Sequence, residues 1–285
     1  MADAIHGNTE LGATKQDIIA AIVQKELAFK AKLMPTITDV SRFAIPGSKT
    51  IEFPKMTSFT VVNRTEGSAG DSSVLTASND IMSLNFNAYV AWIVDAMTKK
   101  QSNIEAEAVL AQRAAAALGR YVDTQIIAEL VSVADLSVNG ASPADIDKAA
   151  VLDMIEQIDA AEGDLDESVF IVPADQRKAL LNISDFSAND VFGRPVNYTG
   201  IIGQLYGLPV LMHNGVGAQQ VLCYEKSGLA VGFQSLPAMD SQPANEFGVG
   251  AERKAMDQLF GVKGQQIAFG GAAAGKSPLV AKLKD

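Results

Sequence analysis

The sequence predicts an α+β fold, and three features carry this prediction. An extended β-hairpin is expected within residues 36–90, a long alanine-rich helix at residues 102–131, and a mixture of helices and strands between residues 140 and 240. A two-stranded ribbon is only marginally stable alone in water, and its open edges can pair with other chains. We therefore expect a chain with so long an arm to complete its fold on a neighbouring molecule.

The composition is that of a globular protein with a sizeable core. Of the 285 residues, 48% are hydrophobic and 20% are charged, enough for one large domain or two smaller ones. The net charge of −10 disfavours a dedicated nucleic-acid-binding protein, which usually has a basic face, but allows a protein that encloses nucleic acid. Cys223 is the only cysteine, so we expect no internal disulfide and a reducing cytoplasm.

The sequence shows neither a secretion signal nor a membrane span. Residues 1–14 are polar and lack a basic segment followed by an apolar one, which a secretory signal requires. No apolar run approaches the roughly 20 residues that cross a bilayer. We therefore expect a soluble protein with no membrane partner.

The N-terminal part of the sequence is expected to form a helix followed by the hairpin. Apolar residues recur at near-helical spacing over residues 15–33, and Pro35 ends that helix. Ile51 and Phe53 alternate along the outgoing strand, where Pro54 indicates an edge position. The apolar side chains of the return strand also alternate with polar ones, and they are Met82, Leu84, Phe86, Ala88 and Val90.

The long helix is expected to begin at a capping box formed by Ser102 and Glu105. Alanine dominates its helical stripe, and alanine combines the best helix propensity with a small side chain. Residues 91–100 before it are interpreted as helical, and residues 132–142 after it as a linker. The stripe consists of Ile104, Ala108, Ala111, Ala115, Leu118 and Val122.

Short helices and strands fill residues 140–240. Pro143 marks the first position of a helix that ends near Gly163, and residues 174–182 form another helix. Strands are expected at 169–172, 209–212, 221–224 and 229–233, with further strand-like segments near 247–250, 258–262 and 265–269.

One motif suggests nucleotide chemistry. Gly270, Gly275, Lys276 and Ser277 satisfy the Walker A pattern, in which a strand delivers a phosphate-binding loop and a helix begins at the Lys-Ser pair. Pro278 follows at once, and only eight residues remain after Ser277, so there is no room for the crossover or a later metal-binding carboxylate. We favour a glycine-alanine connector before a short C-terminal strand.

Other combinations of residues give even weaker evidence of a catalytic or metal-binding site. His6 and His213 are the only histidines, so a histidine-based triad would depend on His213. No spacing suits zinc, and one acidic group lacks the offsets of a calcium loop and is interpreted as a solvated loop: Glu162, Asp164, Asp166 and Glu167. No catalytic, metal-binding or cofactor-binding residue is identified, and we expect the protein not to be an enzyme.

The order of segments resembles that of the major capsid proteins of tailed bacteriophages, which have the Hong Kong 97 fold. The resemblance rests most on VFIVPADQRKALLN at residues 169–182 followed by GIIGQLYGLPVLMHN at residues 200–214. It implies an N-terminal arm at 1–35, an extended hairpin loop at 36–90, a peripheral domain at 91–139 and 241–285 with its spine helix at 102–131, and an axial domain of mixed α/β structure at 140–240.

The resemblance also implies a structural function. Copies of the chain would form hexamers and pentamers that close into an icosahedral shell around double-stranded DNA, without sequence-specific binding. A separate scaffolding protein and a portal would take part in assembly, the chain would be made in the host bacterial cytoplasm, and its final location would be the virion capsid. The hairpin tip, residues 63–73, would contact other subunits through Arg64, Glu66, Gly67 and Asp71.

Two alternatives remain at this point. An encapsulin-type nanocompartment shell protein would have the same fold, and sequence separates it poorly from a phage capsid protein. A small P-loop nucleotide-binding protein would use Lys276 on its phosphates. Some members of the family that the chain resembles form lysine crosslinks between subunits. We do not predict such a crosslink for Lys49 or Lys55.

Overall fold

The computed structural model describes residues 31–56, 77–94, 105–139, 145–183, 201–216, 220–247, 250–264 and 277–284. Several sequence-based predictions lie outside these residues. They are the helix at 15–33 up to residue 30, the hairpin tip at 63–73, the capping residue Ser102 and the glycine-rich segment before Ser277.

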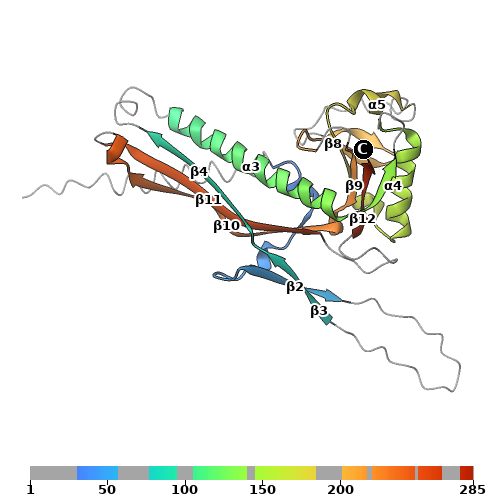
Figure 1. Ribbon diagram of the computed structural model, residues 1–285, viewed down its shortest axis with the longest axis horizontal. Helices are drawn as coiled ribbons and strands as arrows, with labels where there is room; N and C mark the ends of the chain where they lie inside the picture. The colour runs from blue at the N-terminus through green and yellow to red at the C-terminus, as the bar shows by residue number, and fades with distance from the viewer. Residues whose placement is uncertain are drawn as a thin grey trace, which may run out of the picture.

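The described residues form three parts (Figure 1). A long helix, α3 (Glu105–Val133), lies along an elongated four-stranded sheet. A six-stranded sheet with helices α4 (Lys148–Ala160) and α5 (Arg177–Asn182) forms a more compact region at the C-terminal end of α3. A two-stranded ribbon projects away from both (Figure 1). The predicted mixture of an arm, a long helix and an α/β region is confirmed.

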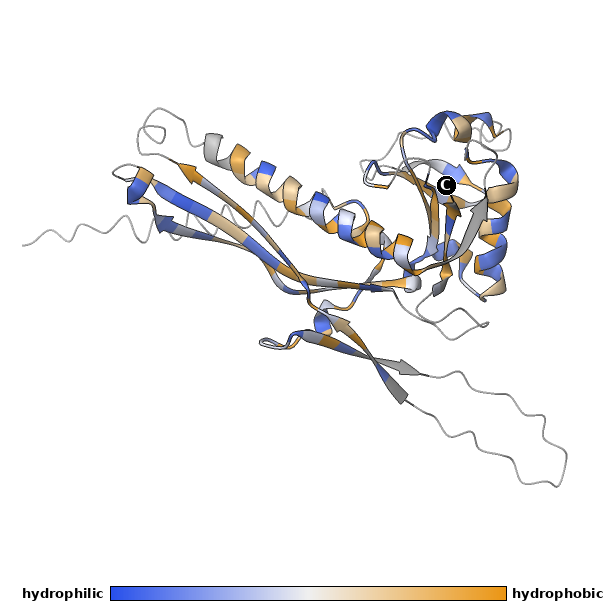
Figure 2. Ribbon diagram, in the orientation of Figure 1, coloured by the Kyte–Doolittle hydropathy of each residue, from blue (hydrophilic) through white to orange (hydrophobic). Residues whose placement is uncertain are grey.

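The four-stranded sheet joins segments that are far apart in sequence. Its order is β1-β10-β11-β4, where β1 is Thr38–Asp39, β10 is Leu229–Pro243, β11 is Glu252–Gly264 and β4 is Phe86–Val94. Hydrophobic residues colour β10 and β11 near the six-stranded region, and hydrophilic residues dominate toward the turn that joins the two strands (Figure 2). The end of the sheet near the six-stranded region is therefore part of the hydrophobic core, and the end near the turn lies at the surface.

Helix α3 packs on this sheet through small and aromatic residues. Ala111 and Ala115 are fully buried, and their small side chains allow close approach of the helix to the strands. Farther along, the Tyr121 ring meets Phe260 of β11 edge to face at 6.1 Å between centroids. Phe260 in turn contacts Phe86 at 5.3 Å. The long helix predicted at 102–131 is thus confirmed from Glu105 onward, and it continues to Val133.

The six-stranded sheet has the order β5-β12-β9-β6-β8-β7. Neighbouring residues on its strands enter different cores, because successive side chains of a strand point to opposite faces. Tyr224 and Val280 belong to the core that contains α3, whereas Cys223 and Ala281 pack with Met154 of α4. Helices α3 and α4 therefore cover opposite faces. The strands are Ala134–Asn139 (β5), Ser277–Lys284 (β12), Leu222–Glu225 (β9), Ser168–Val172 (β6), Leu208–Met212 (β8) and Ile201–Leu205 (β7).

The hairpin is shorter than predicted. The ribbon pairs β2 (Thr50–Met56) with β3 (Ala77–Ser83), and the chain then leaves it. Residues 86–94 form β4, which pairs with β11 instead, so the expectation of a hairpin to residue 90 was wrong. Residues 91–94 are strand and not helix. The alternation of apolar and polar residues continues from β3 into β4. The two strands are distinguished only by their partners, because β3 pairs with β2 and β4 pairs with the distant strand β11.

Other boundaries also differ from the predictions. The supposed linker at 132–142 contains β5, and α4 begins at Lys148, where the Asp147 side chain accepts from the Ala150 amide. Residues 229–240 were assigned to the axial domain and 277–284 to the peripheral one, but β10 belongs to the four-stranded sheet and β12 pairs with β5 and β9. The domain boundaries themselves stay a prediction. No helix in the described part of the chain is long and apolar enough to span a membrane.

Candidate functional site

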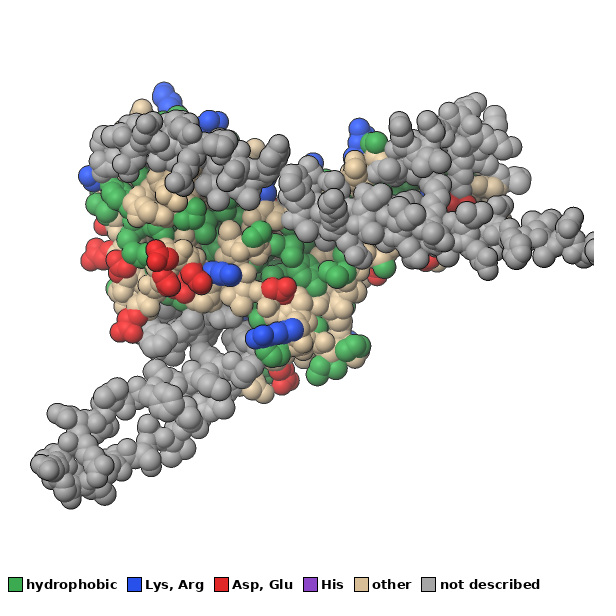
Figure 3. Space-filling model, turned by 180° about the vertical axis from the view of Figure 1, so that it is seen from behind, with side chains coloured by type: hydrophobic (Ala, Val, Ile, Leu, Met, Phe, Trp, Pro, Cys, Tyr) green, Lys and Arg blue, Asp and Glu red, His purple; other side chains and the backbone are tan. Residues whose placement is uncertain are grey.

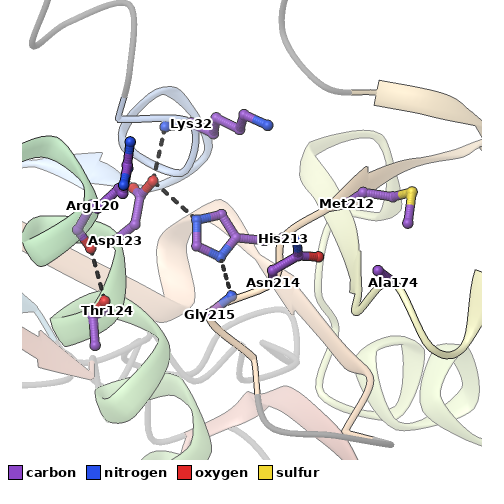
Figure 4. Close-up of a pocket in the computed structure, with 9 residues that line it drawn as sticks. All are labelled: Lys32, Arg120, Asp123, Thr124, Ala174, Met212, His213, Asn214 and Gly215. Atoms are coloured by element: carbon purple, nitrogen blue, oxygen red, sulfur yellow. Dashed lines mark hydrogen bonds and ion pairs between the residues drawn. The ribbon is translucent and has the colours of Figure 1, made fainter. Parts of the chain in front are cut away.

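Asp123 of α3 is the centre of a joint between three chain segments. Its side chain is 1% exposed, and its carboxylate accepts the backbone N–H groups of Lys32 at 3.1 Å and Leu33 at 3.3 Å. The same carboxylate lies 3.2 Å from Nε2 of His213, which follows strand β8 (Figure 4). The segment before β1, the long helix and the end of β8 thus meet at one buried charge.

The arrangement explains how a buried carboxylate is tolerated in α3. Burying an unpaired charge is costly, but hydrogen bonds to the charged form offset much of that cost. Three donors converge on Asp123 here. Because a carboxylate accepts and an amide N–H donates, His213 carries a proton on Nε2 and accepts the Gly215 N–H at Nδ1, over 3.0 Å. Both ring nitrogens are therefore engaged.

A pocket of about 620 Å³ opens beside this joint. Figure 4 shows the side chains of Lys32 and His213 between α3 on one side and Met212 and Ala174 on the other. Arg120 also lines the pocket, one helical turn before Asp123. Lys32 and Arg120 are exposed, and within the part of the chain that the structure describes neither side-chain cation has an ion-pair partner. The pocket therefore offers two cations above a satisfied carboxylate.

The His213–Asp123 pair lacks the geometry of a catalytic dyad with a nucleophile. Its Nδ1 is occupied by the Gly215 amide, and the nearby Thr124 hydroxyl donates to the Arg120 carbonyl over 2.8 Å within the helix. A general base needs a free nitrogen within hydrogen-bond reach of the group that it deprotonates. The pair is consequently suited to holding segments together.

The other motifs of the sequence fall into structural roles where they are described. Ser277 begins strand β12, whereas a Walker A serine must begin a helix, so the P-loop interpretation is contradicted. In the acidic segment the Asp164 carboxylate accepts the Asp166 amide, and the described residues contain no group of three metal-binding side chains. The predicted contact residues at the hairpin tip lie outside the described residues and stay predictions: Arg64, Glu66, Gly67 and Asp71.

Sequence reasoning missed Asp123, although a signal was present. Asp123 stands four residues after Gly119 and four before Ile127, both of which are buried, so it interrupts the apolar stripe of the helix. An acid in such a position predicts a buried, hydrogen-bonded carboxylate. Its partners could not be read from the sequence because they lie about 90 residues away in both directions.

A second surface lies on the four-stranded sheet, on the strand at its edge. Tyr89 and Ile93 of β4 are 61% and 40% exposed. They line a pocket of about 530 Å³ together with Trp92 and Arg253. Exposed apolar side chains that gather in a hollow commonly mark a protein interaction site.

The chain and its fold can be compared with those of known proteins. A family model described as phage capsid protein matches residues 33–214. The chain therefore belongs to the phage capsid protein family, and it is a capsid shell protein. No protein of curated function matches the sequence.

Solved structures confirm the Hong Kong 97-like fold. The capsid of cyanophage P-SCSP1u is similar with a TM-score of 0.63 and 11% identity, over 87% of this chain and 86% of that one. A structure from Mycobacterium phage Adephagia is similar with a TM-score of 0.64 and 14% sequence identity, over 89% of both chains. A virus-like particle from Pyrococcus furiosus is similar with a TM-score of 0.61 and 10% sequence identity, over 94% of this chain and 98% of that chain.

Proposed function

We propose that this chain is the major capsid protein of a tailed bacteriophage and forms hexamers and pentamers of an icosahedral shell that encloses double-stranded DNA. The observation that carries the proposal is the β2–β3 ribbon. It forms a separate two-stranded sheet that projects from the body of the molecule (Figure 1). Such a ribbon gains stability by lying on another surface.

The described side chains anchor the ribbon at its base. Ile51 of β2 and Met82 of β3 are fully buried, and they pack with Val40 and Ala230 in a small core of their own. Next to Met82, the Ile81 side chain is 49% exposed, although its carbonyl accepts from Nζ of Lys263 over 2.8 Å. A firm base and a projecting outer part suit an arm that reaches an adjacent copy, and we assign residues 49–83 to that arm.

The exposed face of β4 is the receiving surface in this proposal. Tyr89, Ile93 and the pocket that they share with Arg253 offer apolar contacts beside a guanidinium group that pairs with Glu246 over 3.1 Å at the surface. Shell contacts can each be modest because closure of the shell multiplies them. The hairpin tip of a neighbouring copy, with Glu66 and Asp71, would bring carboxylates that compete with Glu246 for that cation.

The charge of the chain fits a wall that contains DNA without gripping it. The net charge is −10, and a protein that binds phosphates strongly needs a basic face. Closure alone retains the DNA. A separate scaffolding protein and a portal are the assembly partners in this proposal, and the mature location is the virion.

Electron microscopy of the expressed protein, with and without scaffolding protein, tests the proposal. We expect closed particles built of hexamers and pentamers, and smaller or fewer particles when residues 63–73 are deleted. A monodisperse monomer under every assembly condition would contradict the shell function. Unchanged assembly and shell stability after the deletion would remove the tip contact alone.

An encapsulin-type shell is the second candidate. The similarity to the Pyrococcus furiosus virus-like particle, which spans 98% of that chain, favours it. Particle contents distinguish the two functions, since a phage capsid holds packaged DNA and an encapsulin holds a protein cargo.

A further inference from the structure

The pocket at the Asp123 joint has a chemical complement elsewhere on the same chain. A run of exposed carboxylates follows α4 and the turn after it, and we call it the acidic ridge. Figure 3 shows acidic side chains gathered at the outer end of the six-stranded region. The ridge comprises Asp153, Glu156, Asp159, Glu162, Asp166 and Glu167, all exposed.

We propose that the pocket lined by Lys32, Arg120 and His213 receives the acidic ridge of a second copy of this chain. The inference rests on the proposed shell function and names one contact within its rings. Lys32 and Arg120 are cations without a described ion-pair partner. The incoming carboxylates would pair with these two cations at the mouth of the pocket.

The ridge is built to present its charge outward. Asp153, Glu156 and Asp159 are spaced by three residues, so they share one face of α4. The opposite face buries Met154 and Ile158. Like charges at this spacing repel each other, and a cationic partner would relieve that repulsion.

The two surfaces lie on opposite sides of the molecule. Helices α3 and α4 cover opposite faces of the six-stranded sheet, and Figure 1 shows α4 on the side turned away from α3. A ring of identical subunits needs such a head-to-tail arrangement, in which one face of a copy meets a different face of the next. A pocket on the α3 side and a ridge on the α4 side meet this requirement.

The floor of the pocket favours an anionic guest over a cationic one. The Asp123 carboxylate is already hydrogen-bonded to Lys32, Leu33 and His213, so it offers little to an incoming cation. A volume of about 620 Å³ accommodates several acidic side chains. Asn214 at the rim is exposed and can donate through its amide.

Charge reversal and charge exchange test the contact. Glu156→Lys with Asp159→Lys on the ridge, or Lys32→Glu with Arg120→Glu at the pocket, should each lower the shell yield at least tenfold. The variant carrying all four changes should regain assembly. Arg177→Glu with Lys178→Glu is the matched control, because these exposed cations of α5 belong to neither surface, and it should assemble as the unmodified chain does.

A disulfide trap supplies a second readout. Glu156→Cys with Asn214→Cys places thiols on opposite faces of one copy, so oxidised shells should show ladders of crosslinked subunits, while each single variant should not. Assembly of both reversal pairs at normal yield, or failure of the exchanged variant to assemble although it folds, overturns the contact and leaves the shell function standing. If the unmodified chain forms no shells, the proposed function itself fails.

Discussion

The Nε2 atom of His213 lies 3.2 Å from an oxygen of Asp123, and this contact joins the end of β8 to the middle of the long helix. The Lys32 and Leu33 amides bind the same carboxylate. One buried side chain thereby fixes the six-stranded region and the segment at Lys32 and Leu33 to α3. Any change of angle between these parts must stretch or break one of its hydrogen bonds.

Asp123→Asn should destabilise the subunit by about 3 kcal/mol, because an amide group would face N–H donors and leave buried groups unpaired. Urea unfolding of the unassembled protein measures the change. Arg113→Gln, at an exposed position of the same helix, serves as the control and should unfold like the unmodified chain. If Asp123→Asn also did so, the joint would have no role in stability.

Gln258 of β11 is fully buried beneath α3, and neither the nitrogen nor the oxygen of its amide group has a hydrogen-bond partner among the residues that the structure describes. Gln258→Met keeps the length of the side chain and removes the unsatisfied polar group, so it should stabilise the protein by about 1–2 kcal/mol. Thermal unfolding by calorimetry measures this gain. Gln258→Ala should have the opposite sign because it leaves a cavity, and a lower melting temperature for both variants would refute the explanation.

Local elements of this fold were predictable because nearby residues determine them. The alanine stripe around Ala111 predicted α3, and the apolar run of residues 169–172 predicted β6. The end of the hairpin was not predictable, because the same alternation continues from β3 into β4 and the partner of Val90 is Met256. The contacts of the Asp123 joint were not predictable for the same reason, since they join residues that are distant in sequence. His213 was noticed as a lone histidine, but its partner Asp123 lies 90 residues earlier.

The two neighbouring residues Cys223 and Tyr224 should make the protein less stable in alkaline solution. Burial raises the pKa of the Cys223 thiol above its ordinary value of 9.0 and the pKa of the Tyr224 phenol above 10.0. The unfolded chain therefore releases these protons at a lower pH than the folded chain, and stability falls as pH rises above about 9.

Unfolding free energies measured across that pH range check the effect. Cys223→Ala should lower the stability at neutral pH through lost packing, yet it should flatten the fall that begins near pH 9. The Cys223 thiol should also resist a water-soluble thiol reagent in folded protein. Rapid labelling of the native subunit at mildly alkaline pH would show that the thiol is not shielded.

Gly261 of β11 permits the base of the ribbon to cross the four-stranded sheet. A Cβ at this position would lie 2.5 Å from the Ser83 carbonyl oxygen and 3.2 Å from Cγ of Met82. Backbone cannot give way as a flexible side chain can, so Gly261→Ala should force β3 off the sheet at a cost of about 1–3 kcal/mol. Limited proteolysis of the unassembled subunit should then cut near residues 77–84 much faster, while the six-stranded region stays resistant. Because the ribbon is the proposed arm, the same variant should also assemble poorly. Cleavage and assembly both unchanged would mean that β3 is not held to β11 at this crossing.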